Sequence, residues 1–398
     1  MAQSKPRTIS PEVNEAQALR LVMELMAIPA TSGGESAVAR AIVAHLKRAG
    51  LPASAIAFDT AHRKSPLGGD TGNLIIKLPG TVRRPRRMFS AHMDTVPLCL
   101  GAKPVRRGNK IVSADPATGV GGDDRAGVAI ILNTLLAILR HKLPHPPLTF
   151  LWTVQEEVGL FGARFVDLAK LGKPAMAFNY DGSAGMVLGA TGAYRVAIDI
   201  TGIASHAGGD PEKGVSAITI AGLAIADLHE HGWLGRIRKG RNAGTANVGV
   251  VNAGAATNVV CPQATIRSEA RSPDPAFRRR ILEAHRQAFQ RAARAVKNHE
   301  GKTGRVDFRA QQDYEAFRLD ENEPVVGTVQ TAARSLGMEL EKKVVTAGLD
   351  ANWLVARGIP TVTMGTGSRE AHTTRENLTV SDFLQSCRLT LRLATDVS

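Results

Sequence analysis

Hydrophobic residues before about residue 191 follow two kinds of pattern. Short apolar runs rich in β-branched and aromatic residues predict buried strands, and they cover residues 73–80, 86–97, 148–154 and 176–182. Longer segments with apolar residues at helical spacing predict helices, and they cover residues 15–28, 36–49, 127–142 and 160–170. Because strands alternate with helices, the pattern predicts an α/β fold with helices on both faces of a mixed sheet.

The pattern changes after about Thr191. An alternating strand, further strands and two helices follow within a block of roughly 120 residues, which is enough for a small α+β domain. From about Tyr314 the chain returns to α/β character and ends in a helix. We therefore expect one larger domain made of residues 1–191 and 314–398, with an α+β domain of residues 192–313 inserted into it.

The composition narrows the class of protein. At 398 residues, with 43% hydrophobic and 22% charged residues, the chain is typical of a globular protein with two domains. The N-terminal segment lacks the apolar core of a signal peptide, and the longest apolar stretch, residues 127–139, is interrupted by Asn133 and Thr134. Three widely spaced cysteines indicate neither a disulfide framework nor a CxxC site. We expect a cytoplasmic protein with no membrane partner.

The formal net charge of +14 raises the question of nucleic-acid binding. Basic runs occur at residues 83–87 and 238–241, but only 4% of residues are aromatic. No base-stacking motif or zinc-finger spacing accompanies the basic residues. We therefore expect a solvated basic surface and no nucleic-acid partner.

Acidic residues and histidines gather where the predicted strands end. His92 and Asp94 share a face if the chain is extended there, and Asp123 and Asp124 lie in a glycine-rich turn before a helix. Positions at or beyond a strand end are also taken by Glu156, Glu157, Asp181 and His372. Functional groups of α/β sheets collect at the carboxyl ends of strands. Imidazoles and carboxylates in this number suit zinc or a similar divalent ion.

Each cluster has a plainer explanation when it is taken alone. A His-x-Asp pair is more often a simple hydrogen-bonded pair, an Asp-Asp pair a turn or helix cap, and a Glu-Glu pair part of a solvated face. Adjacent carboxylates such as Glu156 and Glu157 are unfavourable at the end of a buried strand unless something positive compensates them. In extended chain their side chains point in opposite directions. The conjunction of all the clusters favours a metal site.

The segments that carry these residues resemble those of a known family. SAHMDTVP, GGDDRAG, TVQEEVG, YDG and AHTTREN are similar to the signature segments of the M20 dinuclear zinc metallopeptidases, in the same order and over nearly the full length. DDRAG, SHAGGDPEKGVSA and EARS look like the peptidase T-like, tripeptide aminopeptidase branch. The resemblance implies a zinc-exopeptidase-like catalytic domain and a lid role for the inserted domain.

The resemblance also implies two divalent ions, which are zinc in such enzymes. Asp123 would bridge the two ions. His92 and Asp181 would bind one of them, and Glu157 and His372 would bind the other.

Catalytic roles follow from the same resemblance. Asp94 would orient the imidazole of His92. Glu156 would be the general base for the water between the ions. His206, in the inserted domain, would stabilise the tetrahedral oxyanion.

Three further positions match substrate-contacting residues of the family. Asn258 and Arg271 belong to the inserted domain, and arginine is well suited to binding a carboxylate. Arg267 is a nearby competitor for the role of Arg271. Gly367 would bring backbone close to the substrate, although a turn alone also explains a glycine there.

These roles imply a metallo-exopeptidase acting on short peptides, with tripeptide aminopeptidase activity as the leading hypothesis. One alternative is an M20-type amidohydrolase, an aminoacylase, deacylase or carboxypeptidase, acting on N-acyl amino acids or dipeptides. Another is a catalytically inert binding protein stabilised by metal, and the presence of Glu156 favours the enzyme over it. Some relatives form homodimers through the inserted domain, but no sequence feature decides the oligomeric state.

Overall fold

The computed structural model describes residues 12–183 and 185–397. The chain forms two compact units. The large unit contains the chain up to residue 188 together with residues 318–344 and 349–398, and the small unit contains residues 189–317 and 345–348. The sequence predicts an insertion of residues 192–313. The small unit of the structure is a few residues longer at each end, and it also includes residues 345–348 from a later part of the chain.

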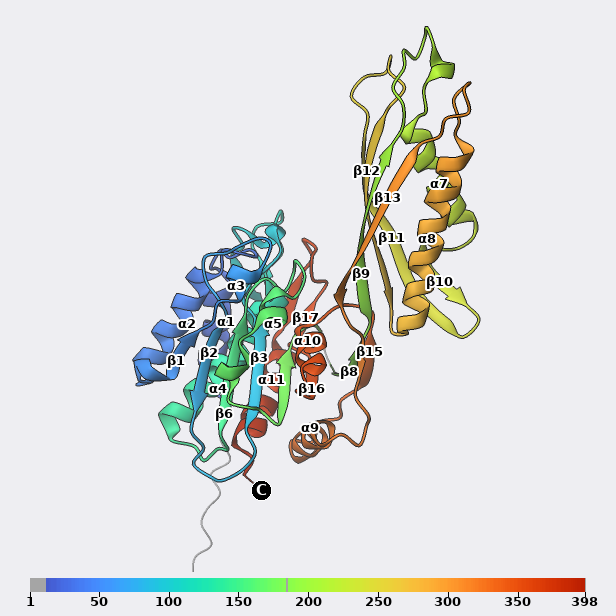
Figure 1. Cartoon of the computed structure of the whole chain (residues 1–398). Coiled ribbons are helices and arrows are strands. Elements are labelled where there is room, and N and C mark those ends of the chain that lie inside the picture. The colour runs from blue at the N-terminus through green and yellow to red at the C-terminus, as the bar shows by residue number, and fades with distance from the viewer. Residues whose placement is uncertain (1–11, 184, 398) are drawn as a thin grey trace, which may run out of the picture. The chain divides into compact units, whose positions relative to one another are not determined.

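A nine-stranded mixed sheet forms the centre of the large unit (Figure 1). Its strand order is β1 (Ile56–Phe58), β2 (Leu74–Leu78), β6 (Leu148–Thr153), β3 (Arg87–His92), β7 (Met176–Tyr180), β16 (Thr361–Met364), β8 (Met186–Ala190) and β14 (Phe317–Arg318), and β15 (Lys342–Val345) pairs with β8. The central strands β6, β3, β7 and β16 are parallel to their neighbours within this group. The predicted α/β fold with a mixed sheet is confirmed.

Helices cover both faces of this sheet (Figure 1). They are α1 (Glu15–Met26), α2 (Ser36–Arg48), α3 (Ala61–Lys64), α4 (Gly122–His141), α5 (Phe161–Phe165), α6 (Leu168–Leu171), α9 (Pro324–Ser335), α10 (Asp350–Ala356) and α11 (Val380–Thr395). Helix α4 packs against β3, α1 and α11. Both faces of the central strands are therefore buried, which explains why these strands are almost continuously apolar.

Alternate residues of the central strands form two separate apolar layers. Phe89, Phe150 and Phe178 lie side by side on β3, β6 and β7, with ring centroids 5.5 Å apart for Phe89 and Phe150 and 5.2 Å apart for Phe89 and Phe178. The next residues along the strands face the other way, and Met88 and Leu151 belong to a different buried cluster. This period of two is the pattern that the sequence shows.

The expected single helix over residues 160–170 is wrong. The chain forms two short helices instead, α5 and α6, separated by Val166 and Asp167. Asp167 has an extended backbone, and its side chain accepts a hydrogen bond from the N–H of Ala169. A side chain that caps a new helix N-terminus in this way competes with continuation of the first helix.

A second sheet of the large unit was not predicted from the sequence. It has four strands in the order β17 (Ser368–Arg369), β18 (Asn377–Thr379), β5 (Lys110–Ser113) and β4 (Pro104–Arg107). Its strands are short and come from two segments far apart in the sequence, so no local hydrophobic pattern marks the pairing of β18 with β5.

The small unit is an α+β structure. Its sheet is antiparallel, with the order β10 (Gly235–Lys239), β11 (Asn242–Ala253), β12 (Gln263–Ser272), β9 (Gly192–Thr201) and β13 (Arg305–Tyr314). Helices α7 (Ala217–Glu230) and α8 (Pro275–Ala295) pack against each other and against this sheet (Figure 1). Apolar residues of both helices and of the central strands form one core cluster.

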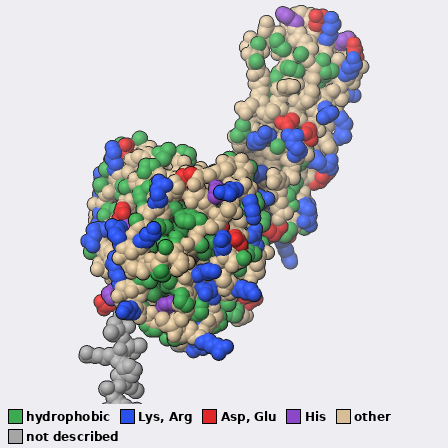
Figure 2. Space-filling view, turned by 60° about the vertical axis from the view of Figure 1, so that its left-hand side comes forward, with side chains coloured by type: hydrophobic (Ala, Val, Ile, Leu, Met, Phe, Trp, Pro, Cys, Tyr) green, Lys and Arg blue, Asp and Glu red, His purple; other side chains and the backbone are tan. Residues whose placement is uncertain are grey.

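The surface carries many separate basic side chains. On the face shown in Figure 2, Lys and Arg are scattered among acidic, polar and apolar side chains over both units. Among the helices that the structure describes, none has the length and apolar character needed to cross a membrane.

Replacing Phe89→Ala is expected to destabilise the large unit by about 3–5 kcal/mol, because it leaves a cavity between two other rings. Phe58→Ala provides the matched control, since the side chain of Phe58 on β1 is 42% exposed, and we expect a loss of about 1 kcal/mol or less. Urea denaturation of both variants measures the difference. Equal losses would show that the aromatic layer does not stabilise the sheet as described.

Candidate metal centre

The parallel direction of β3, β6 and β7 brings their carboxyl ends to one edge of the sheet. His92 is the last residue of β3, Asp181 directly follows β7, and Glu157 lies in the loop after β6. Asp123 lies in the first turn of α4, and His372 lies in the loop between β17 and β18. Five side chains from distant parts of the sequence therefore meet at this edge.

These five residues form two groups that share Asp123. One group is His92, Asp123 and Asp181, and the other is Asp123, Glu157 and His372, with the possible ligand atoms of each group within 4.8 Å of one another. Oδ1 of Asp123 is 3.2 Å from Nε2 of His92, and Oδ2 of Asp123 is 3.6 Å from Nε2 of His372. The two oxygens of one carboxylate thus face two different histidines, as a bridging ligand requires.

The spacing and chemistry of the two groups fit divalent ions. Ligand atoms around a tetrahedral zinc with bonds of ~2.0–2.1 Å lie about 3.3 Å apart. Two imidazoles and three carboxylates form a donor set that suits zinc and related ions.

Asp94 lies behind His92, where the sequence predicts an orienting residue. Its Oδ1 is 3.4 Å from Nδ1 of His92. The Asp94 carboxylate also accepts hydrogen bonds from the backbone N–H groups of Glu156, at 3.0 Å, and Glu157, at 3.2 Å, and from the Ser32 hydroxyl, at 2.6 Å. Burial alone would raise the pKa of Asp94, but its hydrogen bonds and the charge of His92 lower it. Asp94 therefore positions a predicted ligand and both glutamates.

The two glutamates do not continue the strand as extended chain. Strand β6 ends at Thr153, and Gln155 has a φ of 56°, in the left-handed region. The sequence predicts that the side chains of Glu156 and Glu157 point in opposite directions because the chain is extended there. The chain is not extended at this point, so that explanation is wrong. A turn at Gln155 sets their directions, and Glu157 reaches Nε2 of His372 at 2.9 Å.

Buried hydrogen bonds hold the left-handed turn at Gln155. The Gln155 side chain accepts from the Ser65 hydroxyl and donates to the Gly68 carbonyl, both at 2.5 Å. Its backbone N–H donates to Oε1 of Glu35 at 2.9 Å, and the same oxygen accepts from Gly33 N–H at 2.9 Å. Left-handed backbone is uncommon for glutamine and persists when the surroundings determine it.

Glu376 holds the loop that carries Asp123. Its carboxylate accepts from the backbone N–H of Asp123 at 2.9 Å and of Gly121 at 2.8 Å. Gly121 has a φ of 73°, which favours glycine. Cys99, a tempting metal ligand in the sequence, instead lies 3.5 Å from Glu376, and burial raises the pKa of its thiol.

Asp124 supports the backbone, as its turn position suggests. Its carboxylate accepts from the backbone N–H of His92 at 3.1 Å and of Gly127 at 3.1 Å. The peptide bond between Asp123 and Asp124 is cis. Burial raises the pKa of Asp124 well above its ordinary value.

The electrostatics of the cluster favour a positive charge. Burial, with the neighbouring charge of Asp123, raises the pKa of Asp181 well above its ordinary value. Burial also raises the pKa of Glu156 and of Glu157. The hydrogen bond to Glu157 is the main cause that raises the pKa of His372 to about 9. Several buried carboxyl groups with raised pKa values in one place favour a bound cation, because a positive charge stabilises their ionised forms.

The residues expected to contact substrate from the inserted domain lie in the small unit. Nδ1 of His206 accepts backbone N–H groups from Gly208, at 3.1 Å, and Gly209, at 2.9 Å. This assignment places the proton on Nε2, which is then a donor. Arg271 donates to the carboxylate of Glu269 at 3.0 and 2.9 Å.

Asn258 and Gly367 have local structural roles. The carbonyl of Asn258 accepts from Ala207 N–H at 2.9 Å, next to His206. Gly367, in the large unit, has a φ of 90°, and a Cβ there would lie 2.9 Å from the backbone nitrogen of Phe383. Close packing therefore explains a glycine at position 367 without a substrate contact.

Sequence reasoning missed three buried carboxyl groups of this site. They are Glu35, Asp350 and Glu376. Asp350 begins α10 and accepts a hydrogen bond from the Thr153 hydroxyl at the end of β6, and burial raises its pKa to about 6. The local signal for Glu35 and Asp350 was an acidic residue among glycine or apolar neighbours, as in SGGES and GLDANW, whereas Glu376 lies in the segment AHTTREN.

The chain is similar to known peptidases along most of its length. Residues 88–396 match the family described as Peptidase family M20/M25/M40. The uncharacterized protein YqjE of Bacillus subtilis is 31% identical over 388 residues, which cover 97% of this chain and 100% of YqjE. A tripeptidase structure from Staphylococcus aureus has a TM-score of 0.85 and 29% identity, over 96% of this chain and 98% of that one. The aminopeptidase PepT structure from Bacillus cereus has a TM-score of 0.81 and 30% identity, with the same coverage.

Glu35 is expected to make stability depend on pH. Burial, with the nearby charge of Asp94, raises the pKa of Glu35 from 4.5 to about 7. The unfolded chain ionises this group near pH 4.5 and the folded protein near pH 7, so the fold loses stability as the pH rises between these values. The loss amounts to roughly 3 kcal/mol.

Glu35→Gln keeps an oxygen for the N–H groups of Gly33 and Gln155 and removes the charge. In metal-free protein, we expect its stability relative to the unchanged chain to rise between pH 5 and pH 8, measured by urea denaturation at both values. Glu339→Gln, at an exposed position, should show no such difference. A variant whose stability tracks that of the unchanged chain at both pH values would contradict the assignment.

Proposed function

The chain belongs to peptidase family M20/M25/M40, in its peptidase T-like branch, and we propose that it is a dinuclear zinc exopeptidase that releases the N-terminal residue of tripeptides. The family match and the similarity to peptidases indicate a hydrolase that acts on peptide bonds. The observation that carries the proposal is the pair of ligand groups that share the Asp123 carboxylate.

In this proposal, Asp123 would be shared by two ions, and the remaining four residues would hold those ions in pairs. His92 and Asp181 hold one ion, and Glu157 and His372 hold the other, in agreement with the two groups that the structure brings together. When bound, such ions lower the pKa of water and polarise the scissile carbonyl. Zinc is favoured over magnesium or calcium because two of the five donors are imidazoles.

Glu156 is the proposed general base. It is buried and directly precedes Glu157 in the sequence, and burial, followed by the charges of neighbours that include Asp181 and Glu157, raises its pKa. The hydrogen bond from its backbone N–H to Asp94 fixes its main chain. In this role the Glu156 carboxylate accepts a proton from the attacking water and returns it to the departing amine.

His206 is the proposed oxyanion donor. Its Nδ1 accepts hydrogen bonds from two backbone N–H groups. The proton of the imidazole is therefore on Nε2, where it can be donated to the negative charge that develops on the oxyanion. Arg271 is a weaker candidate for binding the substrate carboxylate, because Glu269 already occupies its guanidinium group.

The decisive experiment for substrate class is a panel of peptides and amides. We expect the zinc-loaded protein to cleave free tripeptides with a higher kcat/KM than dipeptides, N-acyl amino acids or N-acetylated tripeptides. Preference for N-acyl amino acids would replace the aminopeptidase with the amidohydrolase alternative. Mass spectrometry identifies which residue is released first. Release of the C-terminal residue would identify a carboxypeptidase.

Glu156→Gln is expected to lower kcat by at least ~100-fold, the scale of general acid–base catalysis. The fold and the bound zinc should be retained, because the five proposed ligands are unchanged. Steady-state kinetics, with zinc measured by elemental analysis, test this. Near-normal turnover at full zinc content would remove Glu156 from the mechanism.

Removal of metal by a chelator is expected to abolish hydrolysis, and added zinc should restore it with two equivalents bound per chain. His372→Ala should lower the stoichiometry, because Glu157 would then lose its partner ligand. Activity that survives complete removal of metal would contradict the metallopeptidase.

A further inference from the structure

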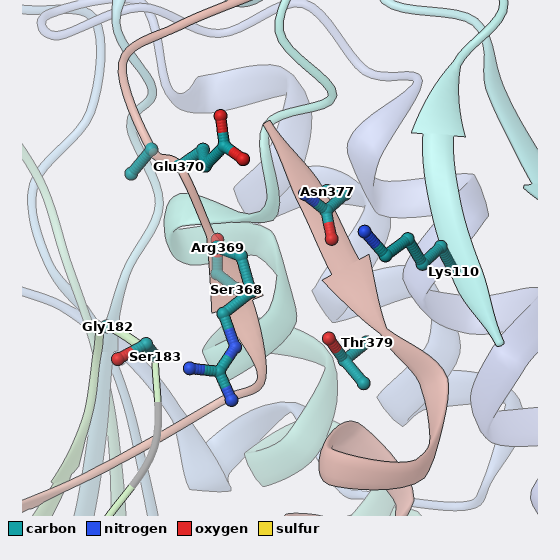
Figure 3. A pocket seen from close by; sticks show the side chains of 9 residues that line it. Lys110, Gly182, Ser183, Ser368, Arg369, Glu370, Asn377 and Thr379 are labelled. Atoms are coloured by element: carbon teal, nitrogen blue, oxygen red, sulfur yellow. The ribbon is translucent and has the colours of Figure 1, made fainter. Parts of the chain in front are cut away.

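A cavity of about 570 Å³ lies next to the proposed metal ligands in the large unit. Its walls include Gly182 and Ser183, which follow the ligand Asp181, and Ala371, which precedes the ligand His372. The remaining walls come from the four-stranded sheet and from Glu370 in the loop after β17 (Figure 3). A molecule bound at the metal ligands could therefore extend into this cavity.

The four-stranded sheet presents one set of side chains to the cavity. Lys110 on β5 is paired directly with Thr379 on β18, and Asn377 on β18 is paired directly with Arg369 on β17. Directly paired residues share a face, and so do residues two apart on one strand. Lys110, Thr379, Asn377 and Arg369 therefore lie on the same face, and all four line the cavity (Figure 3).

On this face, the charge of Lys110 and the further N–H donors of Arg369 are available to an anion. Among residues 12–183 and 185–397, Lys110 has no ion-pair partner. One nitrogen of the Arg369 guanidinium group lies 2.9 Å from the carboxylate of Asp382 and donates a hydrogen bond to it. The guanidinium group has further N–H donors. The one acidic residue of the lining, Glu370, is 2.6 Å from Nε of Arg375, which offsets its charge.

Asn377 provides a second, independent sign of a ligand. Its side chain is buried, with the residue 4% exposed, and Nδ2 donates to the carbonyl of Arg375 at 3.1 Å. Oδ1 of the same amide has no hydrogen-bond partner. A buried acceptor without a donor is unfavourable by about 1–3 kcal/mol. Figure 3 shows the Asn377 amide and the Lys110 amino group turned toward the same part of the cavity.

We propose that this cavity binds a carboxylate of the peptide substrate through Lys110 and Arg369, with Oδ1 of Asn377 accepting an adjacent peptide N–H. A carboxylate next to an N–H is the chemistry of a peptide C-terminus. The inference rests on the proposed function, because it concerns a peptide at the same metal ligands.

The experiment compares a tripeptide with its C-terminal amide. For the unchanged protein we expect a higher kcat/KM for the free acid. Lys110→Met should lower the ratio of kcat/KM for the free acid to kcat/KM for the amide by about 10-fold, which is the scale of a charge-assisted hydrogen bond. The change should come mainly from a higher KM for the acid. Lys103→Met removes an exposed lysine just before β4 that does not line the cavity, and should leave the ratio unchanged.

A third substrate separates two sources of carboxylate. A tripeptide amide with a glutamate side chain should not regain the affinity of the free acid if the cavity binds the C-terminus. If it does regain that affinity, the cavity reads an acidic side chain, and the C-terminal assignment is overturned.

Binding measured without turnover keeps failure of this inference distinct from failure of the proposed function. Calorimetric titration of Glu156→Gln with the acid and the amide gives both Kd values, with and without Lys110→Met. An acid-to-amide Kd ratio that Lys110→Met leaves unchanged overturns the cavity assignment even if peptides are cleaved. A protein that cleaves no peptide but shows the lysine-dependent ratio would instead refute the exopeptidase and keep the cavity.

Discussion

Mutual repulsion between carboxylates at one edge of the sheet is the constraint on which the large unit depends. Possible ligand atoms of Asp123 lie within 4.8 Å of those of Asp181 in one group and of Glu157 in the other. Glu156 adds a further buried carboxyl group. Burial is the largest cause that raises the pKa of Asp181 and of Glu157, and the neighbouring carboxylate of Asp123 raises both further. Two histidines cannot balance this number of acids, whereas a pair of divalent cations can.

A second set of carboxylates resolves a different problem, which is how to hold irregular backbone around the cluster. Hydrogen bonds from two backbone N–H groups reach each of four carboxyl groups, those of Asp94, Glu376, Glu35 and Asp124. Backbone donors in loops beyond a sheet have no strand partner, and a buried N–H without an acceptor is costly. The same bonds fix the directions of the ligand side chains, so stability of the loops and precision of the site have one origin.

The topology explains why strand ends carry the chemistry. Strands β3, β6, β7 and β16 are parallel, so residues that follow them emerge at the same edge. The four-stranded sheet then brings residues 368–379 against residues 104–113, beside the same edge. It carries His372 between two of its strands and presents Lys110 and Arg369 to a cavity next to the ligands. The proposed metal ligand His372 and the proposed carboxylate-binding residues therefore belong to one small sheet.

The sequence by itself determined the α/β fold, most helices and strands, and the identities of the residues that meet at the cluster. These features depend on local period and on residue type, which a single chain displays directly. Tertiary structure alone decided the left-handed turn at Gln155, the break between α5 and α6, and the role of Glu376, whose bond to Gly121 spans 255 positions. A hydrogen bond between residues so far apart leaves no periodic trace in either segment. Its partners become evident only when the folded backbone places a donor in front of an acceptor.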